Sequence, residues 1–174
     1  GSDRISEWRL QTLLAFTQQI AMYRIAEDGS VATLLDLKED SPFAARPLDY
    51  PQIVAPFELA PGEPATLLVS YYSLGASRHT LSIQTPESFA DQARVSTAKN
   101  YAFYGMMMVM IALATVALAT LRQPVFAVYA AYLASILLYI AHADGVAFQY
   151  LWPRHPEFNS MAASVAGSSF MVFG

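Results

Sequence analysis

Hydrophobic and polar positions divide the chain into two unlike parts, with the boundary at about residues 90–100. Before it, short apolar runs alternate with turn-forming residues, and most of the charged residues lie there. After it come long runs without a charged residue. Short alternating runs are typical of β strands, and long charge-free runs are typical of membrane helices. The pattern therefore predicts a β domain over residues 1–90, a connector over 91–100 and a membrane domain over 101–174.

The clearest local signal in the first part is the pair Asp28-Gly29. It separates two apolar runs, residues 19–25 and residues 31–37. An Asp-Gly pair between apolar runs is a strong signal of a tight β-hairpin turn. These residues therefore predict two paired antiparallel strands.

Closely spaced prolines between residues 42 and 64 argue against helix in the next stretch, because proline lacks a backbone donor and clashes with the preceding turn. Residues 52–59 are predicted as an edge strand, since Pro56 interrupts them. Residues 66–73 form a β-branched and aromatic run, and residues 78–85 alternate apolar with polar side chains, as a half-buried strand does. About five or six short strands separated by turn signals predict an all-β sandwich.

The run 101–121 contains no charged residue and has the length of a membrane-spanning helix, which needs about 20 apolar residues. Lys99 and Arg122 bound it. A second such run covers residues 124–143, and a third covers residues 160–174. A buried helix of a soluble protein is the alternative, but such helices rarely lack charge on every face over this length. We therefore predict two complete transmembrane α-helices and part of a third, in a multi-pass membrane protein.

Charge and composition argue against several classes of function for this chain. The formal net charge of −4 provides no basic surface for nucleic acid, which is not expected as a partner. The chain has no cysteine and three scattered histidines, so neither a metal nor another cofactor is predicted. Ser135, His142 and Asp144 can be drawn as a catalytic triad, but there is no nucleophile elbow, and at the end of a span His142 and Asp144 can reach water. No enzymatic activity is predicted for this chain.

One loop of the β part collects charges of both signs, namely Asp36, Glu39, Asp40 and Arg46. Such a loop can bind a small polar molecule through paired hydrogen bonds, and Asp40 and Arg46 are the candidate ligand-binding residues. The alternative is a solvated loop held by an ion pair of Arg46. Both interpretations stay open at this point.

Tyr72 is the third candidate ligand-binding residue, because an aromatic ring can stack on a sugar. Its neighbour Tyr71 is equally aromatic. Adjacent residues of a strand point to opposite faces, so only one of the two rings can belong to a ligand surface, and the other is expected in the core.

Several sequence features together carry a family likeness: Pro42-Phe43 with Arg46-Pro47, Tyr104-Gly105 at the start of the first span, and Gly145 followed by Leu151-Trp152-Pro153. In this order, from about Gln18 onward, the chain resembles the bacterial seven-transmembrane receptors with diverse intracellular signalling modules. The resemblance implies a jelly-roll-like sensor of the carbohydrate-binding type outside the inner membrane, then seven helices. It also implies a cytoplasmic histidine kinase or diguanylate cyclase beyond this chain, and a sensor whose first strands are missing here.

The resemblance leads to a functional hypothesis. The chain is expected to be the ligand-sensing and transmembrane part of a bacterial signal-transduction receptor in the inner membrane. Its expected partners are the lipid bilayer, an unidentified small molecule with carbohydrate as one class, and a second copy of the chain in a homodimer. The connector is the only covalent path between the two parts, so it is expected to couple them. The alternative is a transporter or structural membrane protein with an extracytoplasmic β assembly domain, although neither complete span has a charge or proline at its centre.

The sequence gives conflicting signals about the orientation of the chain across the membrane. Arg94, Lys99 and Arg154 lie near the β side of the spans and only Arg122 near the other side, which favours a cytoplasmic β domain by the positive-inside rule. Aromatic residues near Tyr101 and in the 144–160 loop favour one common interface for that loop and the β domain. The family resemblance places this side outside the cytoplasm, and we follow it, because so few charges decide little.

Overall fold

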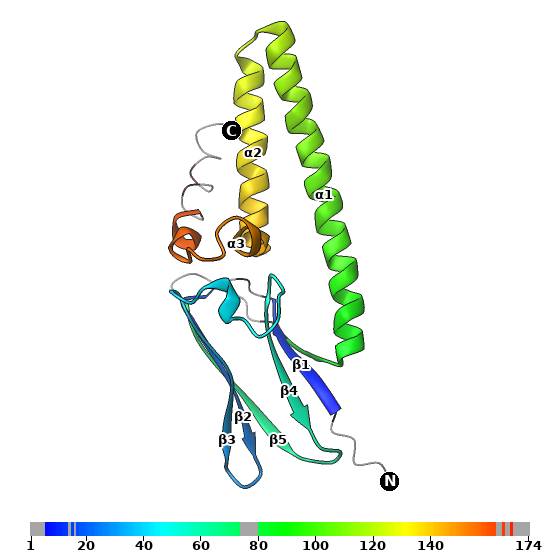
Figure 1. Ribbon diagram of the computed structural model, residues 1–174, viewed down its shortest axis with the longest axis vertical. Helices are drawn as coiled ribbons and strands as arrows, with labels where there is room; N and C mark the ends of the chain where they lie inside the picture. Colours follow the sequence, from blue (N-terminus) through cyan, green and yellow to red (C-terminus); the bar gives the residue numbers. More distant parts are fainter. Residues whose placement is uncertain are drawn as a thin grey trace.

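The computed structural model describes residues 6–13, 15, 17–73, 80–162, 165 and 168 (Figure 1). Two three-stranded sheets form one end of the molecule, and two long helices run side by side away from them. The strands are β1 (Ser6–Thr12), β2 (Gln19–Ala26), β3 (Val31–Lys38), β4 (Ile53–Leu59), β5 (Ala65–Tyr72) and β6 (Leu81–Gln84). The sheets have the orders β4-β1-β6 and β3-β2-β5, and every neighbouring pair is antiparallel. The predicted fold class, a β sandwich followed by membrane helices, is confirmed.

The predicted hairpin is confirmed as β2 and β3. Gln19 lies opposite Lys38, and Ile25 lies opposite Val31. Gly29 turns the chain with a φ of 81°, which is in the left-handed region that favours glycine. The Asp28 carboxylate accepts a hydrogen bond of 2.9 Å from the backbone N–H of Ser30, as an Asx turn does.

The core of the sandwich lies between β1 and β4 on one side and β2 and β3 on the other. It contains Leu10, Ile20, Met22, Leu35, Leu37, Ile53, Ala55 and Phe57. Complete burial of one such large apolar side chain contributes roughly 1.5–3 kcal/mol. This core holds the two sheets together, and the sheets position the loops that face the helices.

Two expectations from the sequence are wrong for β5 and β6, which are edge strands of the two sheets. The alternation in β6 predicted a half-buried strand, but Leu81 is 45% and Ile83 54% exposed. One ring of the pair Tyr71 and Tyr72 was expected in the core, but they are 49% and 57% exposed. The reason is topological: β5 and β6 are edge strands, and the core lies between β1 and β4 of one sheet and β2 and β3 of the other. The prediction of residues 52–59 as an edge strand is confirmed by β4.

Helix α1 (Pro86–Leu121) is one unbroken helix of 36 residues. Thr85 caps it by accepting a hydrogen bond from the backbone N–H of Ser88, and proline occupies the first turn, where its missing donor costs nothing. It ends at Arg122, whose φ of 53° is left-handed. The expected connector, residues 91–100, is thus the first part of the same helix that forms the first span.

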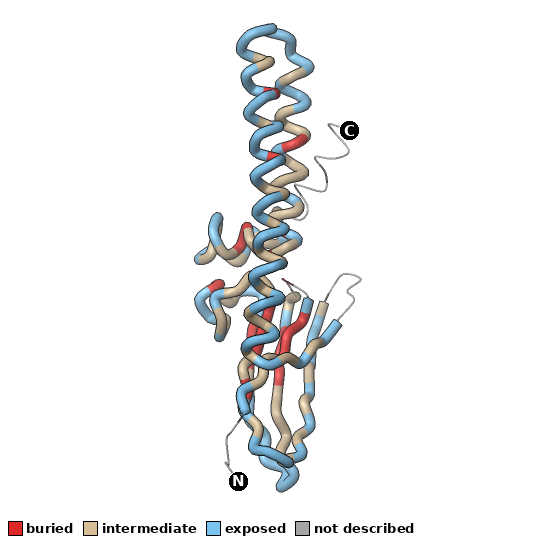
Figure 2. Tube along the Cα trace, turned by 90° about the vertical axis from the view of Figure 1, so that its right-hand side faces the viewer, coloured by how far each residue is buried: buried red, intermediate tan, exposed pale blue. Residues whose placement is uncertain are grey.

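Helix α2 (Val125–Ala143) returns beside α1, and the short α3 (Val146–Tyr150) follows it. Only 11% of the most apolar 18 residues of each of α1 and α2 is buried, so neither helix resembles the core helix of a soluble protein. Figure 2 shows exposed positions along almost their whole length. Residues 157–162 are helical, and most of the third predicted span, 160–174, lies outside the described residues.

Candidate functional site at the junction of the two domains

Two segments that lie far apart in the sequence meet where the sandwich faces the helices. One is residues 39–52, between β3 and β4, and the other is residues 144–160, after α2. The backbone N–H of Phe43 donates to the carbonyl oxygen of Pro153 at 2.9 Å. We call this contact of the two segments the junction. It places the 144–160 loop on the same side of the helices as the β domain.

Arg46 lies at the centre of the junction. Its guanidinium carbon is 4.9 Å from the centroid of the Phe43 ring and 5.4 Å from that of the Phe148 ring, which are cation–π distances. The guanidinium donates to the carbonyl oxygen of Ala15 at 2.7 Å and to that of Pro51. Burial lowers the pKa of Arg46 to about 10, so the group stays charged at neutral pH. One side chain thus joins three separate segments.

Short helical turns aim the groups of the junction. The 3-10 turn η1 (Phe43–Ala45) presents the Phe43 ring, and α3 presents the Phe148 ring edge-on to it, with centroids 5.5 Å apart. The side-chain amide of Gln149 donates to the Asp49 carboxylate at 2.8 Å. Aromatic packing and an amide hydrogen bond therefore add to the contacts of Arg46.

Gly145 allows the closest approach in the junction. Its φ of 81° lies in the left-handed region. A Cβ atom at this position would collide with the carbonyl oxygen of Pro51 and lie 2.9 Å from the Cβ atom of Ala15. Glycine is required here on both counts, because of its conformation and because of its size.

Helix α1 is held to the same loop near its entry into the membrane. The hydroxyl of Tyr104 donates to the Asp144 carboxylate at 2.6 Å, and the hydroxyls of Tyr101 and Tyr150 are 3.3 Å apart. Closer to the sandwich, the rings of Tyr50 and Phe89 pack edge to face. The loop that follows α2 therefore contacts both the β domain and α1.

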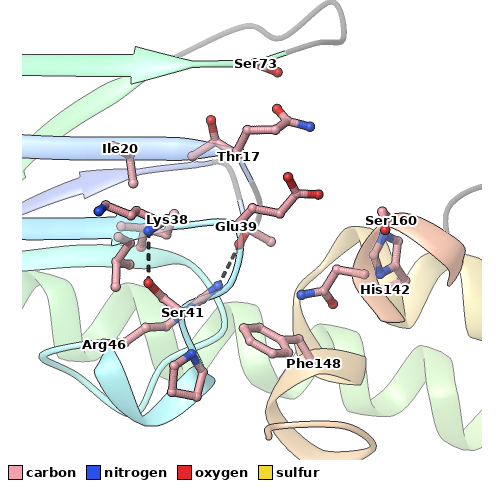
Figure 3. Close-up of a pocket in the computed structure, with 16 residues that line it drawn as sticks. Thr17, Ile20, Lys38, Glu39, Ser41, Arg46, Ser73, His142, Phe148 and Ser160 are labelled. Atoms are coloured by element: carbon pink, nitrogen blue, oxygen red, sulfur yellow. Dashed lines mark hydrogen bonds between the residues drawn. The ribbon is translucent and has the colours of Figure 1, made fainter. Parts of the chain in front are cut away.

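A cavity of about 260 Å³ opens beside these contacts (Figure 3). Its walls come from strand ends of the sandwich on one side and from the end of α2, α3 and residues 159–160 on the other. The lining residues are Ala15, Thr17, Gln18, Ile20, Leu37, Lys38, Glu39, Ser41, Pro42, Arg46, Ile53, Ser73, His142, Phe148, Asn159 and Ser160. In the described part of the chain, no three His, Asp or Glu side chains are grouped to hold a metal ion.

The structure distributes the predicted ligand-binding residues unevenly. Arg46 lines the cavity, whereas Asp40 and Tyr72 do not. Among the described residues Arg46 has no carboxylate partner, because its hydrogen bonds go to backbone carbonyls. The ion pair proposed for this loop is therefore wrong, and ligand binding by the three residues stays a prediction.

Sequence reasoning missed several residues of the site. Phe148 stacks on Arg46 from a segment about 100 positions further along the chain, and Thr17 and Ser160 line the cavity from opposite domains. His142, expected to reach water, is buried with 7% of its surface exposed. Gly145 was the one available signal for this region, since a glycine between two helical segments often marks a left-handed turn or close packing.

Comparison with known families bears on the membrane part. Residues 97–174 match the family model described as 7TM diverse intracellular signalling. The membrane part of this chain is therefore similar to that family. A search of curated proteins and a search of solved structures each gave no match. The match begins inside α1 and leaves out the β sandwich, so it supports a membrane protein, and the role of the sandwich has to be argued from the junction.

Proposed function

We propose that the chain is the ligand-sensing and transmembrane part of a bacterial signalling receptor. In this proposal the sandwich is a sensor on the outer side of the inner membrane, and an output module with its own catalytic activity lies beyond this chain. The segment itself transmits a signal and has no enzymatic role. The family match of the membrane part supports the assignment to signalling.

The observation that carries the proposal is the double attachment of the sandwich to the membrane helices. Covalently, β6 leads through Thr85 into α1, which continues without a break to Leu121. Non-covalently, Arg46 fastens the sandwich to Phe148 in α3, directly after α2. A sensor domain attached at two points can shift one helix relative to the other when its own shape changes.

This arrangement differs from a domain that is merely tethered. A flexible linker would absorb a displacement, but the first turns of α1 are continuous with the membrane span, so the helix carries the displacement onward. Ligand binding must also favour one of two arrangements of the junction by its differential affinity for them. The contacts of Arg46 provide an element that can be made or broken.

Replacement of residues 95–98 with four glycines in the full-length receptor tests the covalent route. Glycine destabilises a helix interior by roughly 1 kcal/mol per residue relative to alanine, so the helix should become flexible there. We expect output that no longer responds to the stimulus, whereas four alanines at the same positions should preserve the response. A normal response in the glycine variant would contradict the proposal.

A further inference from the structure

The cavity at the junction has a defined hydrogen-bonding character. The Thr17 hydroxyl donates its hydrogen to the carbonyl oxygen of Tyr72 at 2.7 Å, so it can offer only an acceptor to a bound molecule. The Ser41 hydroxyl oxygen accepts from the backbone N–H of Lys38 at 2.9 Å, which leaves its hydrogen to be donated. The walls therefore provide at least one acceptor and one donor from the sandwich.

The charge that faces this cavity is negative. The positive charge of Arg46 is used by two carbonyl oxygens and covered by two rings. Lys38 also lines the cavity, but it follows the buried Leu37 in β3, so its side chain leaves the sheet on the outer face. Within the described residues the Glu39 carboxylate has no ion pair, and Figure 3 shows it extending into the space in front of His142 and Ser160.

The size of the cavity limits the ligand. Pockets for drug-sized molecules measure about 300–1,000 Å³. At about 260 Å³ this cavity suits a smaller molecule. Ile20, Leu37 and Phe148 give part of the wall an apolar surface that can cover a short carbon chain.

We propose that this cavity binds a small primary amine that also has a hydrogen-bond acceptor, such as an amino alcohol. The ammonium group pairs with Glu39 and donates to Thr17, and the acceptor of the ligand receives the hydrogen of Ser41. The ammonium group can come from a free molecule or from a lipid headgroup at the membrane surface. As the stimulus of a receptor, this ligand rests on the proposed function, because it would contact the sandwich and the membrane-proximal loop together.

Binding of ethanolamine to this chain in nanodiscs of phosphatidylglycerol tests the inference. Titration followed by calorimetry or ligand-observed NMR should detect ethanolamine. Ethylene glycol replaces the ammonium with a hydroxyl and should bind at least about tenfold more weakly, since a charge-assisted bond is lost. Glu39→Gln should weaken ethanolamine binding by a similar factor. The matched control Glu27→Gln, in the exposed β2–β3 turn and outside the cavity lining, should bind as the original chain does.

Equal binding of the two probes, unchanged binding in Glu39→Gln, or an equal loss in Glu27→Gln would overturn the inference. Thermal unfolding of each variant checks that it is folded. Nanodiscs with phosphatidylethanolamine distinguish the sources: a weaker apparent affinity for ethanolamine assigns the cavity to the lipid headgroup, and an unchanged affinity assigns it to a free amine. Because these measurements need no signalling output, an uncoupled receptor that binds ethanolamine refutes the proposed function alone.

Discussion

The carbonyl oxygen of Pro51 accepts a hydrogen bond from the guanidinium of Arg46, and Gly145 packs against the same oxygen. Two residues from different domains thus converge on one backbone atom. Gly145 can approach this oxygen because it has no side chain. The guanidinium of Arg46 reaches the same oxygen while it packs against the rings of Phe43 and Phe148. The junction should therefore be sensitive to small changes at either residue.

Gly145→Ala should open the junction. A non-glycine residue with a left-handed φ costs of order 1–3 kcal/mol, and the new Cβ atom would also collide with Pro51. We expect a lower thermal unfolding temperature and faster proteolysis of the 144–160 loop. Gly62→Ala is the control for conformation alone, since its φ is 79° with nothing within 4 Å of the new Cβ. If both variants lose the same stability, packing at Gly145 has no role.

Arg46→Lys should weaken the junction although it preserves the charge. A lysine ammonium is a point charge that cannot reproduce the planar fork between two carbonyl oxygens and two rings. We expect a loss of about 2 kcal/mol in the free energy of unfolding, measured by denaturant titration in detergent. Arg94→Lys is the control, because the Arg94–Asp91 pair is 3.6 Å long and exposed, and such pairs contribute little. Equal effects of the two substitutions would contradict the role of Arg46.

Topology can be tested with single cysteines, because the chain has no native thiol. Glu27 lies in the exposed β2–β3 turn, Gln123 between α1 and α2, and Glu157 at the start of the helical residues 157–162, and all three are exposed. With the sandwich outside, a membrane-impermeant thiol reagent on intact spheroplasts should label positions 27 and 157 but not 123. Labelling of position 123 alone would place the sandwich in the cytoplasm and remove the proposal of an external sensor.

The β2–β3 turn should respond to acid. Hydrogen bonds from the Ser30 side chain and backbone lower the pKa of Asp28 below its ordinary value of 3.8. Since the folded pKa lies below the unfolded one, the stabilisation is present above about pH 4 and is lost as pH falls through the folded pKa. The protection factor of the Ser30 amide, which corrects for the intrinsic pH dependence of exchange, should therefore fall below pH 4, and much less so in Asp28→Asn. A loss of protection that is already complete at pH 5 would exclude Asp28 as the cause.

Local chemistry explains which elements could be predicted from the sequence. Asp28-Gly29 specifies its own turn, Pro56 restricts its strand to an edge, and an uncharged run such as 101–121 must find an apolar environment. Each of these signals is contained in neighbouring residues. The hairpin, the edge strand and the membrane helices were accordingly found.

Long-range packing explains what was missed. Whether Leu81 and Ile83 are buried depends on which residues pack against β6. The local sequence does not contain that information. The partners of Arg46 include Ala15 and Phe148, which are distant in sequence. The local sequence instead favours an ion pair between Arg46 and a nearby carboxylate. The cavity arises only once the two domains are docked, and its residues carry no common motif.

The length of α1 has a mechanical consequence. At 1.5 Å per residue, about 22 Å of the helix precedes Tyr101 and about 30 Å follows it. The hydroxyl contacts of Tyr101 and Tyr104 with the loop after α2 lie between these two arms and can act as a fulcrum. A sideways movement of 1 Å at Pro86 would then become roughly 1.3 Å in the opposite direction at Leu121. The helix would then work as a lever. A small movement of the sandwich would produce a larger movement at the other end of α1, on the opposite side of the membrane.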